Sequence, residues 1–236
     1  MMSKIFHYIL LTTQKYGIDE SHGLSHSMNV LAFARDIYKS EINEYPILKD
    51  HQNIIYSAAL LHDMCDKKYV VESIGLDEME QYLMSNNVHV PKPRYFGYDI
   101  AGPYINEVKH EMKLEKVQDL TPNEMTVIKQ IISTMSYSKV KIHGYPDLGP
   151  YQRAYHIVRE ADLLAAYDFD RCMIYDMKRN GKDVVNSFKH ADQLFNDRVL
   201  IHNDDGLFLT NYSKVLSKQL HKQALGRIKV WRDLVM

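Results

Sequence analysis

The sequence predicts an all-α fold, and three observations point to it. Apolar residues recur at helical spacing in several segments, whereas the alternation of apolar and polar residues that marks strands is scarce. With 236 residues, 45% of them hydrophobic and 25% charged, the chain can bury one sizeable core. No repeat or linker divides it. We therefore expect a single compact domain over 1–236, with a core of about 20–175 on which helices of 185–234 pack.

The N-terminal half should contain helices separated by turn residues. The first is amphipathic and should end at Gly17, because glycine accepts the left-handed conformation that closes many helices. One later stretch is rich in Pro, Gly and aromatic residues, so we expect an ordered loop that is a candidate substrate lid. In chain order, the expected elements are helices over 3–16, from about 25, over 51–64 and over 75–86, the loop over 87–103, and helix over 100–117.

The C-terminal half carries clearer helix boundaries. Thr121, Pro122 and Glu124 have the residue types of an N-cap, a first helical position and a capping box, so a helix should cover 123–135. The remaining expectations are a turn-rich stretch over 136–150, one helix over 151–180 closed by Gly181, two more helices after 185 with a break near 202–213, the last helix over 211–234, and at most one small β-hairpin over 201–209.

Composition excludes several classes of function. The net charge is −1 and the basic residues are dispersed, so no footprint for nucleic acid is present. The N-terminal segment lacks the pattern of a signal peptide, and no apolar run is long enough to span a membrane. Cys65 and Cys172 form neither a disulfide framework nor a zinc spacing, which suits a reducing compartment. We expect a cytoplasmic protein without nucleic-acid or membrane partners; a homo-oligomer remains open.

The chemistry should centre on the end of the most apolar helix. The run 54–61 leads directly into His62 and Asp63, and Asp66 follows one turn later. A buried imidazole and carboxylate need a partner, and a divalent metal ion can satisfy both. The alternative is an exposed His-Asp pair at a solvated helix end.

Two further segments offer ligands in similar settings. His22 and His26 are four residues apart near the start of the second helix, so they share a face there, unless they are simply exposed residues of the capping region. Asp162 is flanked by alanine and leucine, and a carboxylate in such surroundings must be paired, protonated or bound to metal. Its local alternative is an ion pair with Arg159.

In order, these candidates are His26, His62-Asp63 and Asp162, in the segments SHGLSHSMNVLAFA, AALLHDMCDKKY and IVREADLLAAYDFDR. This arrangement resembles the HD-domain phosphohydrolase superfamily, and most closely its small single-domain members that hydrolyse nucleotides. The resemblance covers roughly 20–175 and implies that the four residues hold one divalent metal ion. Asn29 stands where that branch usually has arginine, so the resemblance implies the metal site rather than a triphosphate substrate.

Two imidazoles and two carboxylates form a mixed nitrogen and oxygen site that suits Mn, Co, Ni, Fe or Zn better than Mg. Such an ion activates water and polarises a phosphoryl group, so we expect a metal-dependent phosphohydrolase acting on a nucleotide or another small phosphorylated metabolite. Asp66 could exchange the proton of the attacking water or leaving group. Lys67, Lys68 and Lys139 could neutralise phosphate oxygens, unless they are simply exposed to solvent, and His22 could hydrogen-bond the phosphate or the water.

Two other readings remain. An HD-type di-iron oxygenase needs two further histidines between the pair and the last aspartate, and His89 and His110 lie in that interval, although neither has a buried apolar setting. A non-catalytic HD domain that binds a nucleotide is the other reading. The presence of all four ligand candidates together with Asp66 argues against it.

Overall fold

A computed structural model describes residues 1–85 and 119–235, and the expectations for 87–103 and 100–117 lie outside these residues. Within the described ranges the chain consists of helices and turns without a strand, which confirms the all-α prediction. One continuous hydrophobic core runs from Met2 in the first helix to Ile228 in the last.

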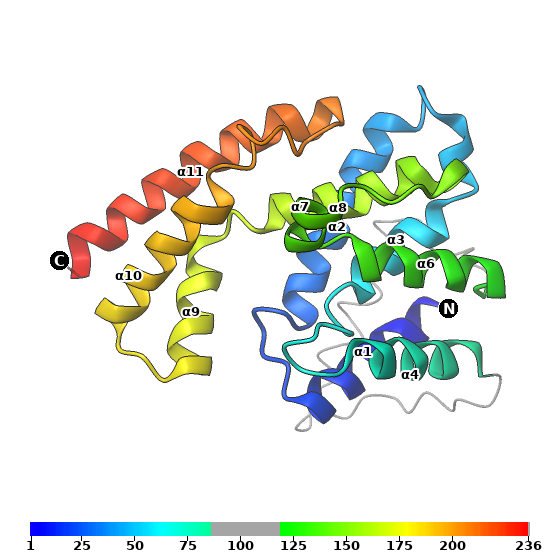
Figure 1. Ribbon diagram of the computed structural model, residues 1–236, viewed down its shortest axis with the longest axis horizontal. Helices are drawn as coiled ribbons and strands as arrows, with labels where there is room; N and C mark the ends of the chain where they lie inside the picture. Colours follow the sequence, from blue (N-terminus) through cyan, green and yellow to red (C-terminus); the bar gives the residue numbers. More distant parts are fainter. Residues whose placement is uncertain (86–118, 236) are drawn as a thin grey trace.

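Three helices occupy the centre of the molecule (Figure 1). They are α2 (Leu24–Glu41), α3 (Gln52–Leu61) and α8 (Gln152–Ala165), and each packs on the other two. Every residue of 54–61 is buried, because small and apolar side chains on all sides of α3 let neighbouring helices approach closely. The ends of these helices bring the candidate ligands together.

Helices α1 (Met2–Tyr16) and α6 (Pro122–Thr134) pack on α3, and α4 (Glu72–Met84) packs on both of them, on one side of this centre (Figure 1). Gly17 ends α1 with φ of 63°, as predicted. The Thr121 hydroxyl accepts from the Glu124 N–H while the Glu124 carboxylate accepts from the Thr121 N–H, which confirms the capping box.

On the other side, α9 (Phe169–Asn180), α10 (Val184–Leu194) and α11 (Asn211–Val235) lie together (Figure 1). A π-helical segment, η4 (Phe195–Val199), continues α10, and turns over 200–206 precede α11. Short 3-10 helices, η1 (Pro46–Lys49) and η3 (Gly149–Tyr151), precede α3 and α8.

Three expectations were wrong. The helix expected over 151–180 is two helices, because the Asp168 side chain accepts from the Arg171 N–H and so starts a new helix at Phe169. Part of the stretch expected to be turns is a helix, α7 (Tyr137–His143), closed by Gly144 at φ of 73°. The hairpin considered for 201–209 is a series of turns, where backbone bonds from Asp205 to Ile201 and from Leu207 to His202 replace strand pairing.

Candidate metal centre

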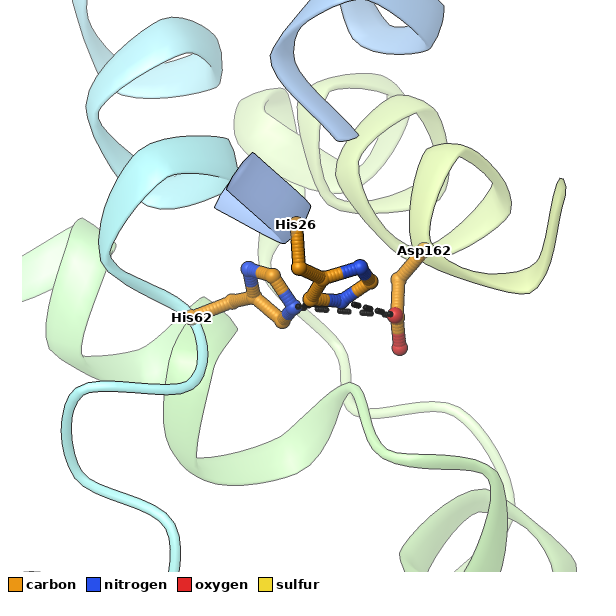
Figure 2. Close-up of side chains that lie close together, drawn as sticks. All are labelled: His26, His62 and Asp162. Carbon is orange, nitrogen blue, oxygen red and sulfur yellow. Dashed lines mark hydrogen bonds and ion pairs between the residues drawn. The ribbon is translucent and has the colours of Figure 1, made fainter. Parts of the chain in front are cut away.

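Four predicted ligands meet where three helices end or begin. His26 lies in the first turn of α2, His62 is the residue that caps the C-terminus of α3, Asp63 follows it, and Asp162 lies in the last turn of α8. Figure 2 shows His26, His62 and Asp162 pointing toward one another from these separate elements. Residues 36 and 100 positions from His62 are thus brought to one point by the packing of α2 and α8 on α3.

The ligand atoms are close. His26 Nε2 and His62 Nε2 are 3.2 Å apart, and Asp63 Oδ2 lies 3.3 Å from each of them. Asp162 Oδ1 lies 3.6 Å from each imidazole nitrogen. Among the described residues, His26, His62 and Asp162 form a group whose ligand atoms all lie within 4.8 Å of one another and that could hold a metal ion.

This geometry fits a shared cation. Ligand atoms about 2.1 Å from one ion, at angles between 90° and 109°, are roughly 3.0–3.4 Å apart, close to the separations seen here. Asp63 Oδ2 is buried, and its polar neighbours are the two imidazole nitrogens at 3.3 Å, neither of which makes a hydrogen bond of good geometry to it. Such an atom is costly unless something else satisfies it. A cation placed here could bind both imidazole nitrogens and this carboxylate oxygen at once.

The two histidines are oriented differently. His62 Nδ1 lies 2.9 Å from the carbonyl oxygen of Ala59 and donates to it, so the Nε2 lone pair is free for a ligand bond once His62 has lost its second proton. His26 Nδ1 lies 2.5 Å from Nη1 of Arg171, which also donates to the Ser21 carbonyl. Because a guanidinium only donates, neutral His26 in this position carries its proton on Nε2. An ion on Nε2 therefore requires that proton to move and Arg171 to turn away.

Within the cluster, the charges of the two carboxylates favour a protonated His62. Burial alone lowers the pKa of His62, but Asp63 and Asp162 outweigh it and hold that pKa well above 6.5. Burial raises the pKa of both carboxyl groups, and the neighbouring histidines reverse this, so both pKa values lie below the usual range. The pKa of His26 is lowered by burial and by the charge of Arg171.

A cavity of about 650 Å³ opens beside the cluster, and all four predicted ligands line it. The predicted residues His22, Asp66 and Lys68 line it too. Lys68 Nζ lies 3.0 Å from His22 Nε2 and 3.7 Å from Asp66 Oδ2, so the three form one polar group. Burial lowers the pKa of His22 to about 4 against the opposing charge of Asp63, and this keeps the histidine neutral.

Lys139 also lines the cavity, but its ammonium is already engaged. It donates to the carbonyl oxygen of Ser133 at 2.6 Å and forms a short ion pair with Glu72. Sequence reasoning missed other lining residues, among them Arg171, Arg198 and His202. Arg171 could have been found from Asp168, because an aspartate that caps a new helix places Arg171 in its first turn. No comparable feature of the sequence marks Arg198 or His202.

The structure decides between some of the alternatives. His26 and His62 are 4% and 7% exposed, which excludes solvated positions for them. Arg159 is directed to the Leu207 carbonyl at 2.5 Å and to Glu160 at 3.4 Å, and no ion pair with Asp162 forms among the residues described. His89 and His110, which the oxygenase alternative needs, lie outside the described residues.

No protein-family model, curated protein or solved structure matches this chain. The resemblance to HD-domain phosphohydrolases therefore remains a prediction. Within 1–85 and 119–235, no helix has the length and apolar character needed to cross a membrane.

Proposed function

We propose that this protein is a metal-dependent phosphohydrolase that acts on a small phosphorylated metabolite, a nucleotide being the expected class. The observation that carries the proposal is the group of His26, His62 and Asp162, set beside the unsatisfied Asp63 Oδ2 at the wall of a cavity. Mixed imidazole and carboxylate donors favour Mn, Fe, Co, Ni or Zn. When bound, such an ion supplies a more acidic water and a polarised phosphoryl group.

The lining of the cavity supports an anionic substrate. Six cationic side chains line it, against five carboxylates, of which Asp63 and Asp162 would be neutralised by a divalent ion. The volume of about 650 Å³ lies within the range of small-molecule sites, roughly 300–1,000 Å³. Phosphate esters and anhydrides are the common metabolites that combine such a size with concentrated negative charge.

Asp66 is the residue we propose for proton transfer. It follows Asp63 by one turn, with its N–H bonded to the Asp63 carbonyl at 3.2 Å, and its side chain lines the cavity at 23% exposure. In hydrolysis a water oxygen bonds to phosphorus while the bond from phosphorus to the leaving oxygen breaks. The Asp66 carboxylate accepts the proton that the water gives up and returns it to the leaving oxygen, a role worth ~10²–10⁴ in rate.

Lys68 and His22 supply a positive charge in a fixed position. Lys68 can only donate, so it bonds to the Nε2 lone pair of His22, whose Nδ1 then faces Ser21 and Tyr69 at 2.7 and 3.1 Å. Both of these hydroxyls bond in turn to Asp19. The chain of bonds holds the Lys68 ammonium at the cavity, where it can neutralise a phosphoryl oxygen. Lys139, already paired with Glu72, is the weaker candidate for this role.

The direct test combines metal content with hydrolysis. We expect purified protein incubated with Mn²⁺ or Co²⁺, then desalted, to retain about one ion per chain, and Asp63→Ala to retain much less. The matched control is Asp66→Asn, which should keep the ion and lose turnover. Phosphate or pyrophosphate should be released from at least one member of a panel of phosphorylated metabolites. Equal metal content in wild type and Asp63→Ala would remove the proposed site.

The same experiment separates the alternatives. Iron-dependent oxygen consumption without phosphate release would favour the oxygenase. Tight binding of a nucleotide with no turnover at any metal would favour a non-catalytic domain. The cytoplasmic location expected from the sequence is part of the same proposal, and the unpaired Cys65 and Cys172 suit a reducing compartment.

A further inference from the structure

A second group of cations lines the same cavity, and the proposed phosphoryl chemistry does not use it. Lys141 comes from α7 and Arg198 from the π-helical segment η4. Both approach the ring of Tyr137: Lys141 Nζ and the Arg198 guanidinium carbon each lie 5.5 Å from its centre. Lys141 Nζ also lies 3.2 Å from the Tyr137 hydroxyl. We call Tyr137, Lys141, Arg198 and His202 the α7–η4 wall.

The positive charges of this wall are not neutralised. Within the described part of the chain, no carboxylate lies at ion-pair distance from Lys141 or Arg198, whereas Lys139 is paired with Glu72. Asp205 accepts a hydrogen bond of 3.4 Å from the Tyr137 hydroxyl and does not line the cavity. Two cations that approach the same aromatic ring repel each other, so a bound anion within reach of both would be favoured.

The backbone that carries Arg198 is itself unusual. The N–H of Leu200 bonds to the carbonyl of Phe195 at 2.8 Å, the five-residue spacing of a π-helix. Such turns are rare and occur frequently at functional sites, because the extra residue changes which side chains face a neighbour. Here Phe195, Arg198 and Val199 all line the cavity.

His202 adds an independent sign of a ligand. It is 2% exposed, lines the cavity, and its Nδ1 has no hydrogen-bond partner. Its ring centre lies 5.4 Å from that of Tyr137, which places it in the same wall. A buried ring nitrogen without a partner is unfavourable unless a bound molecule satisfies it.

We propose that the α7–η4 wall is a second anion-binding subsite, so that the substrate carries two separated anionic groups. The phosphoryl group that reacts lies at the metal centre, and a second phosphate or carboxylate lies against Lys141 and Arg198, within reach of His202. Among the residues that the structure describes, no hydrogen bond or ion pair joins Lys141 or Arg198 to the four predicted ligands, so the two subsites are distinct parts of one cavity. The assignment of the reacting group rests on the proposed function; the second subsite rests on the wall itself.

The test compares ligands that differ only in the second anion. Non-hydrolysable probes allow the wild-type protein to be used: alkylphosphonates and the α,ω-alkanediphosphonates with spacers of three to six carbons, titrated calorimetrically into Mn²⁺-loaded protein. We expect at least one diphosphonate to bind about tenfold or more tightly than its monophosphonate. The reason is that hydrogen bonds from Lys141 and Arg198 to a second phosphonate join charged groups, and such bonds are stronger than those between neutral groups. A phosphonate with a terminal carboxylate shows whether the second group must be a phosphate.

The variant that carries the test is Lys141→Gln combined with Arg198→Gln, both at exposed positions where folding should be unaffected. It should abolish the advantage of the diphosphonate and leave monophosphonate affinity unchanged. The matched control, Lys129→Gln, removes a lysine outside the cavity and should keep the advantage. Absence of any advantage, or one that survives the double substitution, would overturn the subsite. Failure to hydrolyse any phosphate ester while the advantage persists would instead overturn only the proposed function.

Discussion

Binding of one metal ion should release one proton near neutral pH, and that proton should come from His62. The perturbation is the addition of Mn²⁺ to metal-free protein between pH 6.5 and 7.5. Asp63 and Asp162 have pKa values below the usual range, so both are already ionised. His26, with its pKa lowered by burial and by Arg171, is already neutral. Only His62 holds a proton that the ion must displace.

The release of one proton sets how strongly metal affinity depends on pH. Where a single proton is displaced, the apparent affinity for the ion rises about tenfold for each pH unit, or ~1.4 kcal/mol, from pH 6.5 up to the pKa of His62 in the folded protein. Without His62 in the charged form, the affinity would be nearly constant over this range. The slope therefore reports the protonation of one buried imidazole.

The assay is calorimetric titration at one pH in two buffers of different ionisation enthalpy. The difference between the two heats gives the number of protons released, which we expect to be close to one. Asp66→Asn is the matched control, because Asp66 lines the cavity but lies outside the ligand cluster, and the count should not change. Release of no proton between pH 6.5 and 7.5, or of two, would refute the reasoning about His62.

Three further predictions concern stability and metal affinity. Because the pKa of His62 is raised on folding, its contribution to stability is complete below pH 6.5 and is lost as the pH rises through the pKa of the folded protein. Metal-free protein in EDTA should therefore melt at a lower temperature at pH 8.5 than at pH 6.5. A melting temperature that rises between these two pH values would contradict this. Arg171→Gln should tighten Mn²⁺ binding by about tenfold, since it removes a positive charge and the donor that holds His26 Nδ1; weaker binding would mean that Arg171 orients His26 for the ion. Thr121→Ala should cost about 1 kcal/mol of unfolding free energy in denaturant titrations, through loss of the capping box, with metal affinity unchanged.

Much of the fold could be predicted because local rules and packing agree there. Gly17 closes α1, the residues around Thr121 begin α6, and the apolar run of 54–61 is buried throughout, as their types indicate. The gathering of His26, His62 and Asp162 was also predicted, although through a resemblance rather than from spacing alone. Sequence distance says nothing about which helix ends meet.

The break between α8 and α9 was missed because the apolar pattern continues through it. Ala165 and Phe169 are buried on either side of it, so periodicity gives no sign of a new helix, and only Asp168 as an N-cap marks it. That break redirects α9 so that Arg171 reaches His26. An arginine nine residues after Asp162 would lie elsewhere if the helix were continuous.

The second group of cations could not be predicted for a related reason. Arg198 faces the cavity from a π-helical turn, and the side chains that follow such a turn depart from the 3.6-residue period on which sequence patterns rest. Lys141 lies in a short helix within a stretch that its residues mark as turns. His202 is buried in a turn, where polarity favours exposure.

Anomalous diffraction from crystals of Mn²⁺-loaded protein tests most directly whether four side chains from the ends of three helices hold one cation. The predicted result is a single strong peak about 2.1 Å from His26 Nε2, His62 Nε2 and an oxygen each of Asp63 and Asp162, with Arg171 turned away from His26. A peak bound by other residues, or none at this cluster at full loading, would contradict it.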